Sequence, residues 1–221
     1  MLKYPCLVLD HDDTVVQSEA TVNYPCFCQF LSIHRPEQTI SLEDYVRGCS
    51  SMTFVQMCKE WFDFSDELMQ VEYQYWKDYA KTHIPDTFPG MKELLHAYRN
   101  AGGKICVSSM SAQENILRDY RTHFDLEPDL IFGWDLPEHQ RKPNTYAIES
   151  ICAHYGFSQE QLLVVDDMKF AVPMARNAGC PIAFAGWGRL LFPQIYREMS
   201  ECCDYAFDSP QDLQKFLLEE Y

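Results

Sequence analysis

Short apolar runs alternate along this chain with segments of helical periodicity. An uninterrupted apolar run of a few residues is typical of a strand that is buried on both faces of a sheet. Strands of this kind, separated by helices, form parallel βα units. We therefore expect an α/β protein with a parallel sheet. The predicted strands occupy residues 5–9, 104–108, 130–132, 162–165 and 182–185.

The segment after the first predicted strand has a different character. It contains no strand-like run, and apolar residues such as Leu68, Val71 and Tyr75 recur there at helical spacing behind Ser65, a residue type that caps helices. This pattern indicates an all-helical insertion in the sheet domain. The expected domains are a core formed by residues 1–16 and 87–221, and a helical domain formed by residues 17–86.

Residue types that start and end helices support the alternation. Ser111-Ala112-Gln113-Glu114 matches the capping-box pattern after the second predicted strand, and Ser209-Pro210 is typical of the start of a last helix. Gly102-Gly103 and Gly179 fall where helices should end before the next strand. We expect helices to begin after Ser111 and Ser209.

Composition and charge exclude several classes of function. The chain has 221 residues and a formal net charge of -15, which argues against a nucleic-acid partner, because phosphates require Lys and Arg. No apolar run approaches the roughly 20 residues that cross a bilayer, and the first predicted strand follows Met1 too closely for a signal peptide. We expect a cytoplasmic protein without a membrane partner, and a monomer by default.

The ten cysteines lie in apolar surroundings or in close pairs, without a C-x-x-C spacing. Buried reduced thiols in a reducing compartment account for this pattern better than disulfides or a structural zinc site do.

Polar residues gather where the predicted strands end. In open α/β sheets, ligands bind beyond the carboxyl ends of the strands, so we expect these residues to form one site. Three acids within four residues repel one another unless a cation or a reaction uses them. The candidate residues are Asp10, Asp12 and Asp13 after the first strand, Ser108 and Ser109 after the second, Lys142 after the third, and Asp166 and Asp167 after the fourth.

The order of these segments resembles the haloacid dehalogenase superfamily, in its phosphoglycolate phosphatase and β-phosphoglucomutase branch. The similarity covers nearly the whole chain and implies a Rossmann-like core with a helical cap. It rests on "LVLDHDDTVVQSE", "FPGMKELLHAYRNAGGKICVSS", "RKPNTYAIESICAHYGF" and "LLVVDDMKFAVPMARNAGC".

The resemblance implies a phosphatase that acts on a small phosphorylated metabolite. Asp10 would attack phosphorus and form an aspartyl-phosphate, and Asp12 would protonate the leaving alcohol and then deprotonate the attacking water. Ser108, Ser109 and Lys142 would bind the phosphoryl oxygens.

The resemblance also implies a metal. Mg²⁺ prefers oxygen ligands, which Asp10, Asp166 and Asp167 would supply through carboxylates and Asp12 through its backbone carbonyl. In the cap, Arg47 is a candidate for contact with the distal part of the substrate.

Three positions depart from the family pattern, and one of them, Gln17, stands in the hinge that leads to the cap, where the family often has Asp. Asp13 stands where the family usually has Gly and adds a negative charge beside the expected phosphate site, and Ala171 replaces the second acid of a common form of the last motif. The adjacent pair Asp166-Asp167 matches another form of that motif, so we expect metal binding to persist.

Two alternative functions stay open. A sugar-phosphate mutase of the β-phosphoglucomutase kind shares the core, but those mutases have a cap histidine twelve residues after the nucleophile, where this chain has Val22. A relative that binds metal without catalysis is the other alternative, and Asp13 is the residue that supports it.

Overall fold

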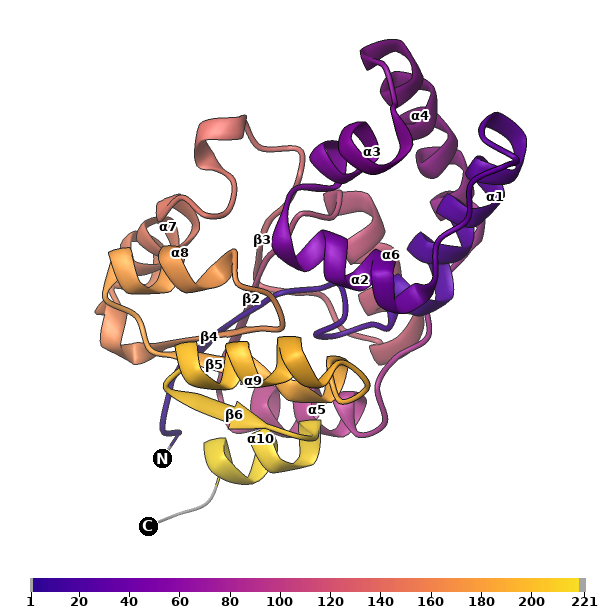
Figure 1. Cartoon of the computed structure of the whole chain (residues 1–221). Coiled ribbons are helices and arrows are strands. Elements are labelled where there is room, and N and C mark those ends of the chain that lie inside the picture. The colour runs from indigo at the N-terminus through magenta and orange to yellow at the C-terminus, as the bar shows by residue number, and fades with distance from the viewer. Residues whose placement is uncertain (1, 219–221) are drawn as a thin grey trace. The chain divides into compact units, whose positions relative to one another are not determined.

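The structure is a computed structural model that describes residues 2–218 (Figure 1). The chain divides into two compact units. One comprises Met1–Val16 and Thr87–Tyr221 and holds all the strands of the described residues, and the other, Gln17–Asp86, is helical.

The first unit is built on a parallel sheet, as the apolar runs predict. The strand order is β3-β2-β1-β4-β5-β6, so β1 lies between β2 and β4. Leu9 pairs in register with Val107 of β2 and with Val165 of β4. This register aligns the carboxyl ends of the three central strands. The strands are β1 (Cys6–Leu9), β2 (Lys104–Ser108), β3 (Leu130–Phe132), β4 (Leu162–Asp166), β5 (Ile182–Ala185) and β6 (Tyr205–Phe207).

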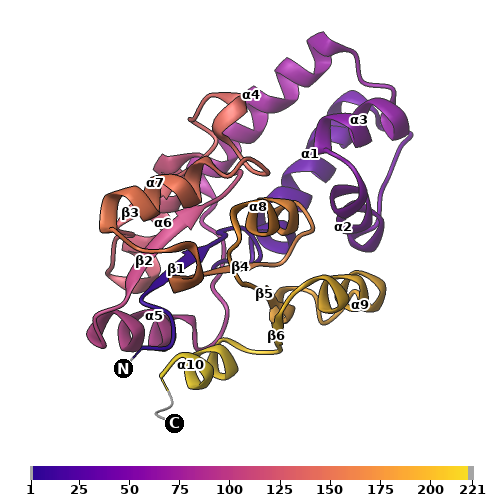
Figure 2. The same cartoon turned by 90° about the vertical axis from the view of Figure 1, so that its left-hand side faces the viewer.

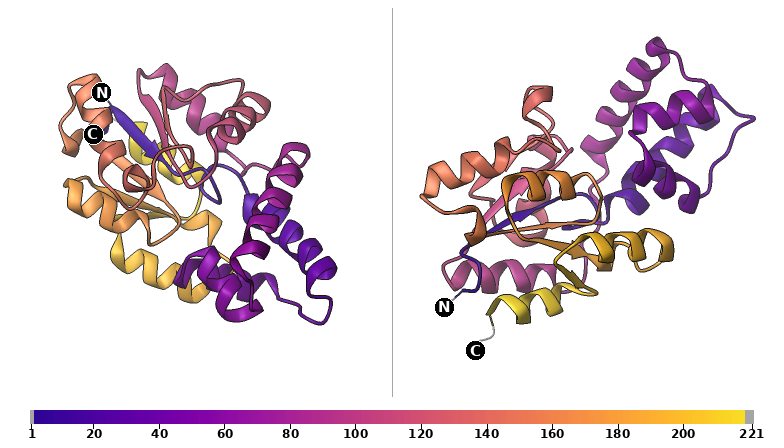
Figure 3. Two further views of the ribbon diagram at one scale, coloured as in Figure 1. Left: turned by 90° about the horizontal axis from the view of Figure 1, so that it is seen from above. Right: turned by 60° about the vertical axis from the view of Figure 1, so that its left-hand side comes forward.

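Helices cover both faces of this sheet (Figures 2 and 3). Side chains alternate along β1, so Leu7 and Leu9 pack into one hydrophobic cluster while Cys6 and Val8 pack into another. The first cluster includes residues of α5 (Met91–Asn100), α6 (Gln113–Phe124) and α10 (Pro210–Leu218), and the second includes residues of α7 (Tyr146–Tyr155) and α8 (Ala171–Ala178). The α/β architecture expected from the sequence is confirmed.

Another helix and three short 3₁₀ turns complete the described part of this unit. The helix is α9 (Pro193–Cys202), whose Tyr196 packs edge-on against Phe184 of β5 at a ring distance of 5.3 Å. The turns are Glu138–Gln140, Gln159–Gln161 and Gly186–Gly188.

Two features differ from the sequence predictions. The sheet has a sixth strand, β6, whose central Ala206 is exposed and which Asp204 and Asp208 flank, so no extended apolar run marks it in the sequence. The capping box predicted at Ser111 is wrong. Helix α6 begins at Gln113 with Ala112 as its N-cap, and the Asp135 carboxylate accepts the Gln113 backbone N–H at 2.6 Å.

The other predicted helix starts are confirmed. The Ser209 hydroxyl accepts the backbone N–H of Asp212 at 3.1 Å, and Pro210 is the first residue of α10. Ser65 likewise accepts the N–H of Leu68 at the start of α4. Gly179 ends α8 with φ +75°, a left-handed conformation that glycine adopts without strain.

The second unit has its own aromatic core. Phe27 contacts Phe62 and Phe54 edge-on at ring distances of 5.2 and 5.4 Å, and Phe30 packs on Phe64. A short π-helical segment, Glu19–Asn23, runs into the first of its helices. The helices are α1 (Tyr24–His34), α2 (Leu42–Ser51), α3 (Phe54–Phe62) and α4 (Asp66–Thr82), drawn in indigo to purple in Figure 1.

Within residues 2–218, no helix combines the length and the apolar character that a bilayer span requires.

Candidate active site

The candidate site begins where β1 and β4 end. Asp10 follows the last residue of β1, and its backbone N–H donates to the Val165 carbonyl at 2.9 Å. Asp166 is the last residue of β4, and Asp167 comes next. All three acids are buried. The parallel register therefore brings together acids that lie more than 150 positions apart in sequence.

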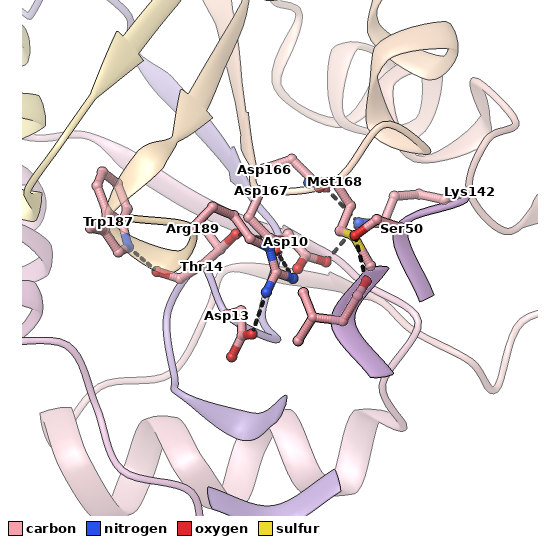
Figure 4. A network of polar contacts seen from close by, with 11 residues as sticks. Asp10, Asp13, Thr14, Ser50, Lys142, Asp166, Asp167, Met168, Trp187 and Arg189 are labelled. Atoms are coloured by element: carbon pink, nitrogen blue, oxygen red, sulfur yellow. Dashed lines mark hydrogen bonds and ion pairs between the residues drawn. The ribbon is translucent and has the colours of Figure 1, made fainter. Parts of the chain in front are cut away.

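Lys142 joins two of these acids, as Figure 4 shows. It lies in the loop between β3 and α7, and its Nζ is 2.6 Å from Asp10 Oδ1 and 2.7 Å from Asp166 Oδ2. Burial alone would lower the pKa of Lys142, but the two carboxylates hold it above its usual value. Burial raises the pKa of the Asp10 carboxyl above its usual range, against the opposing attraction of Lys142. The lysine thus stays protonated between two buried acids.

Three carboxylates form a cluster that suits a divalent cation. Oxygens of Asp10, Asp166 and Asp167 all lie within 4.8 Å of one another. The donor set is entirely oxygen, which matches the ligand preference of Mg²⁺ and similar hard cations. The Thr14 hydroxyl donates to Asp167 Oδ1 at 3.2 Å, and the Met168 backbone N–H donates to Asp166 Oδ1 at 2.9 Å. These bonds orient two of the three carboxylates.

Asp12 lies on the loop that follows β1 and has a different partner. The Ser111 hydroxyl donates to Asp12 Oδ2 at 2.5 Å. The sequence places Ser111 as a helix cap, whereas the structure shows that its hydroxyl holds the Asp12 carboxylate. Each of the four candidate acids Asp10, Asp12, Asp166 and Asp167 therefore has a neighbouring side chain or backbone group that fixes its carboxylate.

The two serines after β2 lie beside Asp10 in the sheet. Because Leu9 pairs with Val107, Ser108 follows at the position next to Asp10. Ser108 is buried, and its hydroxyl lies 3.8 Å from Met174 Sδ, a weak contact. Ser109 accepts the Ser111 backbone N–H on its hydroxyl oxygen and donates its own N–H to the Phe132 carbonyl. The Ser108 hydroxyl donates to this weak sulfur acceptor, so its hydrogen, like that of Ser109, can be redirected to a ligand.

Arg189 is a part of this cluster that the sequence analysis did not identify. It follows the 3₁₀ turn after β5, and its side chain is only 1% exposed. Nη1 is 2.9 Å from Asp13 Oδ2, and Nη2 forms an ion pair with Asp167 Oδ2. The sequence signal for this role is a single arginine among the apolar and glycine residues of "FAGWGRLLF", directly after a predicted strand.

Asp13 has the left-handed backbone that its position requires. Its φ is +53°, a region that Gly and, less readily, Asp adopt. The turn therefore accommodates Asp at the position where the family resemblance leads one to expect Gly. Its charge is not isolated beside the site, because Arg189 pairs with it.

A second buried polar pair links the loop after β1 to α6. His11 Nε2 is 3.0 Å from Asp119 Oδ2 of α6, and the Arg118 guanidinium contacts the other Asp119 oxygen at 2.7 Å. Both His11 and Asp119 are buried. This pair ties the residue next to Asp10 to α6.

Arg47 lies in α2 of the helical unit. It is exposed and forms an ion pair with Asp44, one turn earlier on the same helix, at 2.6 Å. Its contact with substrate stays a prediction.

The sequence was compared with protein-family models and with curated proteins. A family model described as "Haloacid dehalogenase-like hydrolase" matches residues 7–185. No curated protein matches the sequence at a significant level.

Solved structures share the fold at low sequence identity. A predicted phosphoglycolate phosphatase from Haemophilus somnus 129pt is 18% identical, with a TM-score of 0.77 over 98% of this chain and 99% of that one. A protein from Bacteroides fragilis, named as a haloacid dehalogenase-like hydrolase, is 20% identical, with a TM-score of 0.79 over 96% and 100% of the two chains. CbbY from Rhodobacter sphaeroides, solved in complex with phosphate, is 15% identical, with a TM-score of 0.70 over 95% and 96%.

Proposed function

Because the chain belongs to the haloacid dehalogenase-like hydrolases, the family that the sequence motifs predict, we propose that it is a magnesium-dependent phosphatase. Its substrate is a small phosphorylated metabolite. The observation that carries this proposal is the Lys142 ammonium between Asp10 and Asp166, because it combines a buried nucleophilic carboxylate with a cation that can bind a phosphoryl group.

In the first step, an Asp10 oxygen attacks the phosphorus atom. The new Oδ–P bond forms as the bond between phosphorus and the leaving oxygen breaks, and Asp12 gives its proton to that oxygen. The contact from Ser111 directs the Asp12 carboxyl group for this transfer.

In the second step, water attacks the aspartyl-phosphate. Asp12, now a carboxylate, accepts the proton of the water, and the bond between Asp10 and phosphorus breaks to release inorganic phosphate. The hydroxyls of Ser108 and Ser109 and the ammonium of Lys142 bind the phosphoryl oxygens in both steps.

The metal would be held by the carboxylates of Asp10, Asp166 and Asp167 and the backbone carbonyl of Asp12. A bound divalent cation supplies electrostatic stabilisation of the negative charge on the transferring phosphoryl group. The buried, all-oxygen cluster of the three carboxylates supports this assignment.

Structures of similar fold support the substrate class. CbbY from Rhodobacter sphaeroides has been solved with phosphate, and a point mutant of it with xylulose-(1,5)bisphosphate, which is a small phosphoester.

The test is a phosphate-release assay with an aryl phosphate, sugar phosphates and phosphoglycolate, with Mg²⁺ and with EDTA. We expect release only with Mg²⁺, and a loss of at least about 10³-fold in kcat for Asp10→Asn, because the amide is a poor nucleophile. Glu127→Gln is the matched control, since this carboxylate is exposed and pairs with Arg121.

Equal activity of Asp10→Asn and the wild type would reject the proposal. Conversion of a hexose 1-phosphate to the 6-phosphate without phosphate release would identify a mutase instead.

A further inference from the structure

The loop after β5 packs closely against the loop after β1. Trp187 Nε1 donates to the Thr14 carbonyl at 2.9 Å. A Cβ atom on Gly188 would lie 2.1 Å from the Asp13 carbonyl oxygen, so only glycine permits this approach. These contacts hold the next residue, Arg189, at a defined place beside the acids.

Arg189 brings a permanent positive charge to that place. A guanidinium does not lose its proton in a protein, and this one is fully buried. It contacts Asp13 on one side and Asp167 on the other (Figure 4). A fixed cation therefore lies on one of the three carboxylates that would bind a metal.

The acids of this network outnumber the cations that pair with them. Asp10 and Asp166 share Lys142, while Asp13 and Asp167 share Arg189. Among the acids that pair with these two cations, four carboxylates thus face two cationic side chains, which leaves two negative charges when all four are ionised. One divalent cation neutralises that charge. With glycine at position 13, Arg189 would leave only one negative charge for the metal.

We propose that the charge of Arg189 lowers the metal affinity of the carboxylate cluster, and that Asp13 compensates for this charge. The inference rests on the proposed metal-dependent function and explains the unusual acid at position 13. Asp13 and Arg189 act as a pair, because either one alone would shift the charge of the site by a full unit.

The two substitutions have opposite expected effects on metal affinity. Arg189→Met removes the cation that competes for Asp167, so the divalent cation binds more tightly. Asp13→Asn keeps the size of the side chain and tolerates the left-handed turn but leaves Arg189 uncompensated, so the cation binds more weakly. A unit charge a few ångströms from the metal is expected to change its affinity by about tenfold in each direction.

A merely structural clamp predicts something else. If the Asp13–Arg189–Asp167 contacts only hold Asp167 in position, both single substitutions displace the ligand and both weaken binding. The sign of the Arg189→Met effect therefore separates the two roles.

The experiment is calorimetric titration of the whole chain with MgCl₂ alone, for the wild type, Asp13→Asn, Arg189→Met and the double variant. We expect the dissociation constant to rise about tenfold in Asp13→Asn, to fall about tenfold in Arg189→Met, and to return within about twofold of the wild type when both are changed. Arg189→Lys, which keeps the charge, should stay within about threefold of the wild type.

Circular dichroism checks that each variant is folded. If Arg189→Met does not fold, Arg189→Gln, which also removes the charge but keeps a polar side chain, takes its place in the test. Shifts of both single variants in the same direction, or of neither, would overturn the inference while leaving the phosphatase intact. A wild type that does not bind Mg²⁺ at millimolar concentration would overturn the inference together with the proposed metal dependence. Phosphate release in EDTA would then show whether a phosphatase without that metal remains.

Discussion

The residues of the candidate site have roles that depend on their partners more than on their type. Ser111 fits a helix-capping pattern in the sequence, yet its hydroxyl contacts Asp12 and another residue, Asp135, caps the helix. A lysine in a loop is usually on the surface. The side chain of Lys142, however, is only 5% exposed and bridges two acids. Burial of a charge costs free energy unless it is paired, so such a lysine is a sensitive position.

We predict that Lys142→Met lowers the free energy of unfolding by about 3–5 kcal/mol, because it leaves Asp10 and Asp166 as buried carboxylates without their cation. Urea unfolding in EDTA measures this change. Lys215→Met is the control, because that lysine is exposed and lies 4.0 Å from Asp212, and its expected effect is within about 0.5 kcal/mol. Equal effects of the two substitutions would contradict a buried charge bridge.

In the helices, local sequence determines where a helix begins, whereas tertiary packing determines which side chains are buried. Ser41, Thr53 and Ser65 cap α2, α3 and α4 through their own side chains, which sequence alone can indicate. Helix α4 also buries an acid, Glu72, near Cys26 and Cys58. The spacing of residues in the sequence does not predict that Glu72 is buried, because an acid in a helix usually lies on the exposed face.

Glu72 makes the stability of the protein pH-dependent. Burial raises its pKa from 4.5 to about 7. A group with a raised pKa in the folded state stabilises the fold fully below its unfolded pKa, and that contribution is lost as pH rises through the folded pKa. We therefore expect stability to fall between about pH 4.5 and pH 7–8, by up to about 3 kcal/mol from this group.

Glu72→Gln should remove this part of the pH dependence and raise the melting temperature at pH 8 more than at pH 5. Thermal unfolding followed by circular dichroism at both pH values checks it. Glu60→Gln, an exposed acid on α3, is the control and should keep the wild-type pH dependence. A wild-type dependence that survives in Glu72→Gln would refute the prediction.

Across the molecule, all ten cysteines are free thiols, of which five are buried, four are partly buried and one is exposed. Burial raises the pKa of Cys26 and Cys180 to about 12, which suppresses the reactive thiolate at neutral pH. Cys202, at the end of α9, is exposed.

Titration with a thiol reagent at pH 8 should therefore show Cys202 reacting fast in the native protein, and all ten thiols reacting in denaturant. Cys202→Ser should abolish the fast phase, while Cys180→Ser should leave it unchanged. Fewer than ten thiols in freshly denatured protein without reductant would indicate a disulfide.

The apolar runs are sufficient to predict the parallel sheet, because strands buried on both faces must be apolar along their whole length. Likewise, the acids and the lysine at strand ends are predictable as a group, because parallel strands end at one edge. The short edge strand β6 escapes this logic, because its central Ala206 is exposed and Asp204 and Asp208 flank the strand.

Pairings across the fold are a different matter. Arg189 and Asp13 lie 176 positions apart, and nothing in either segment encodes their contact. It arises when the loop after β5 packs through Trp187 and Gly188 onto the loop after β1. Local sequence patterns indicate which residues are buried. The partner of a buried charge, however, depends on which strands become neighbours in the folded sheet.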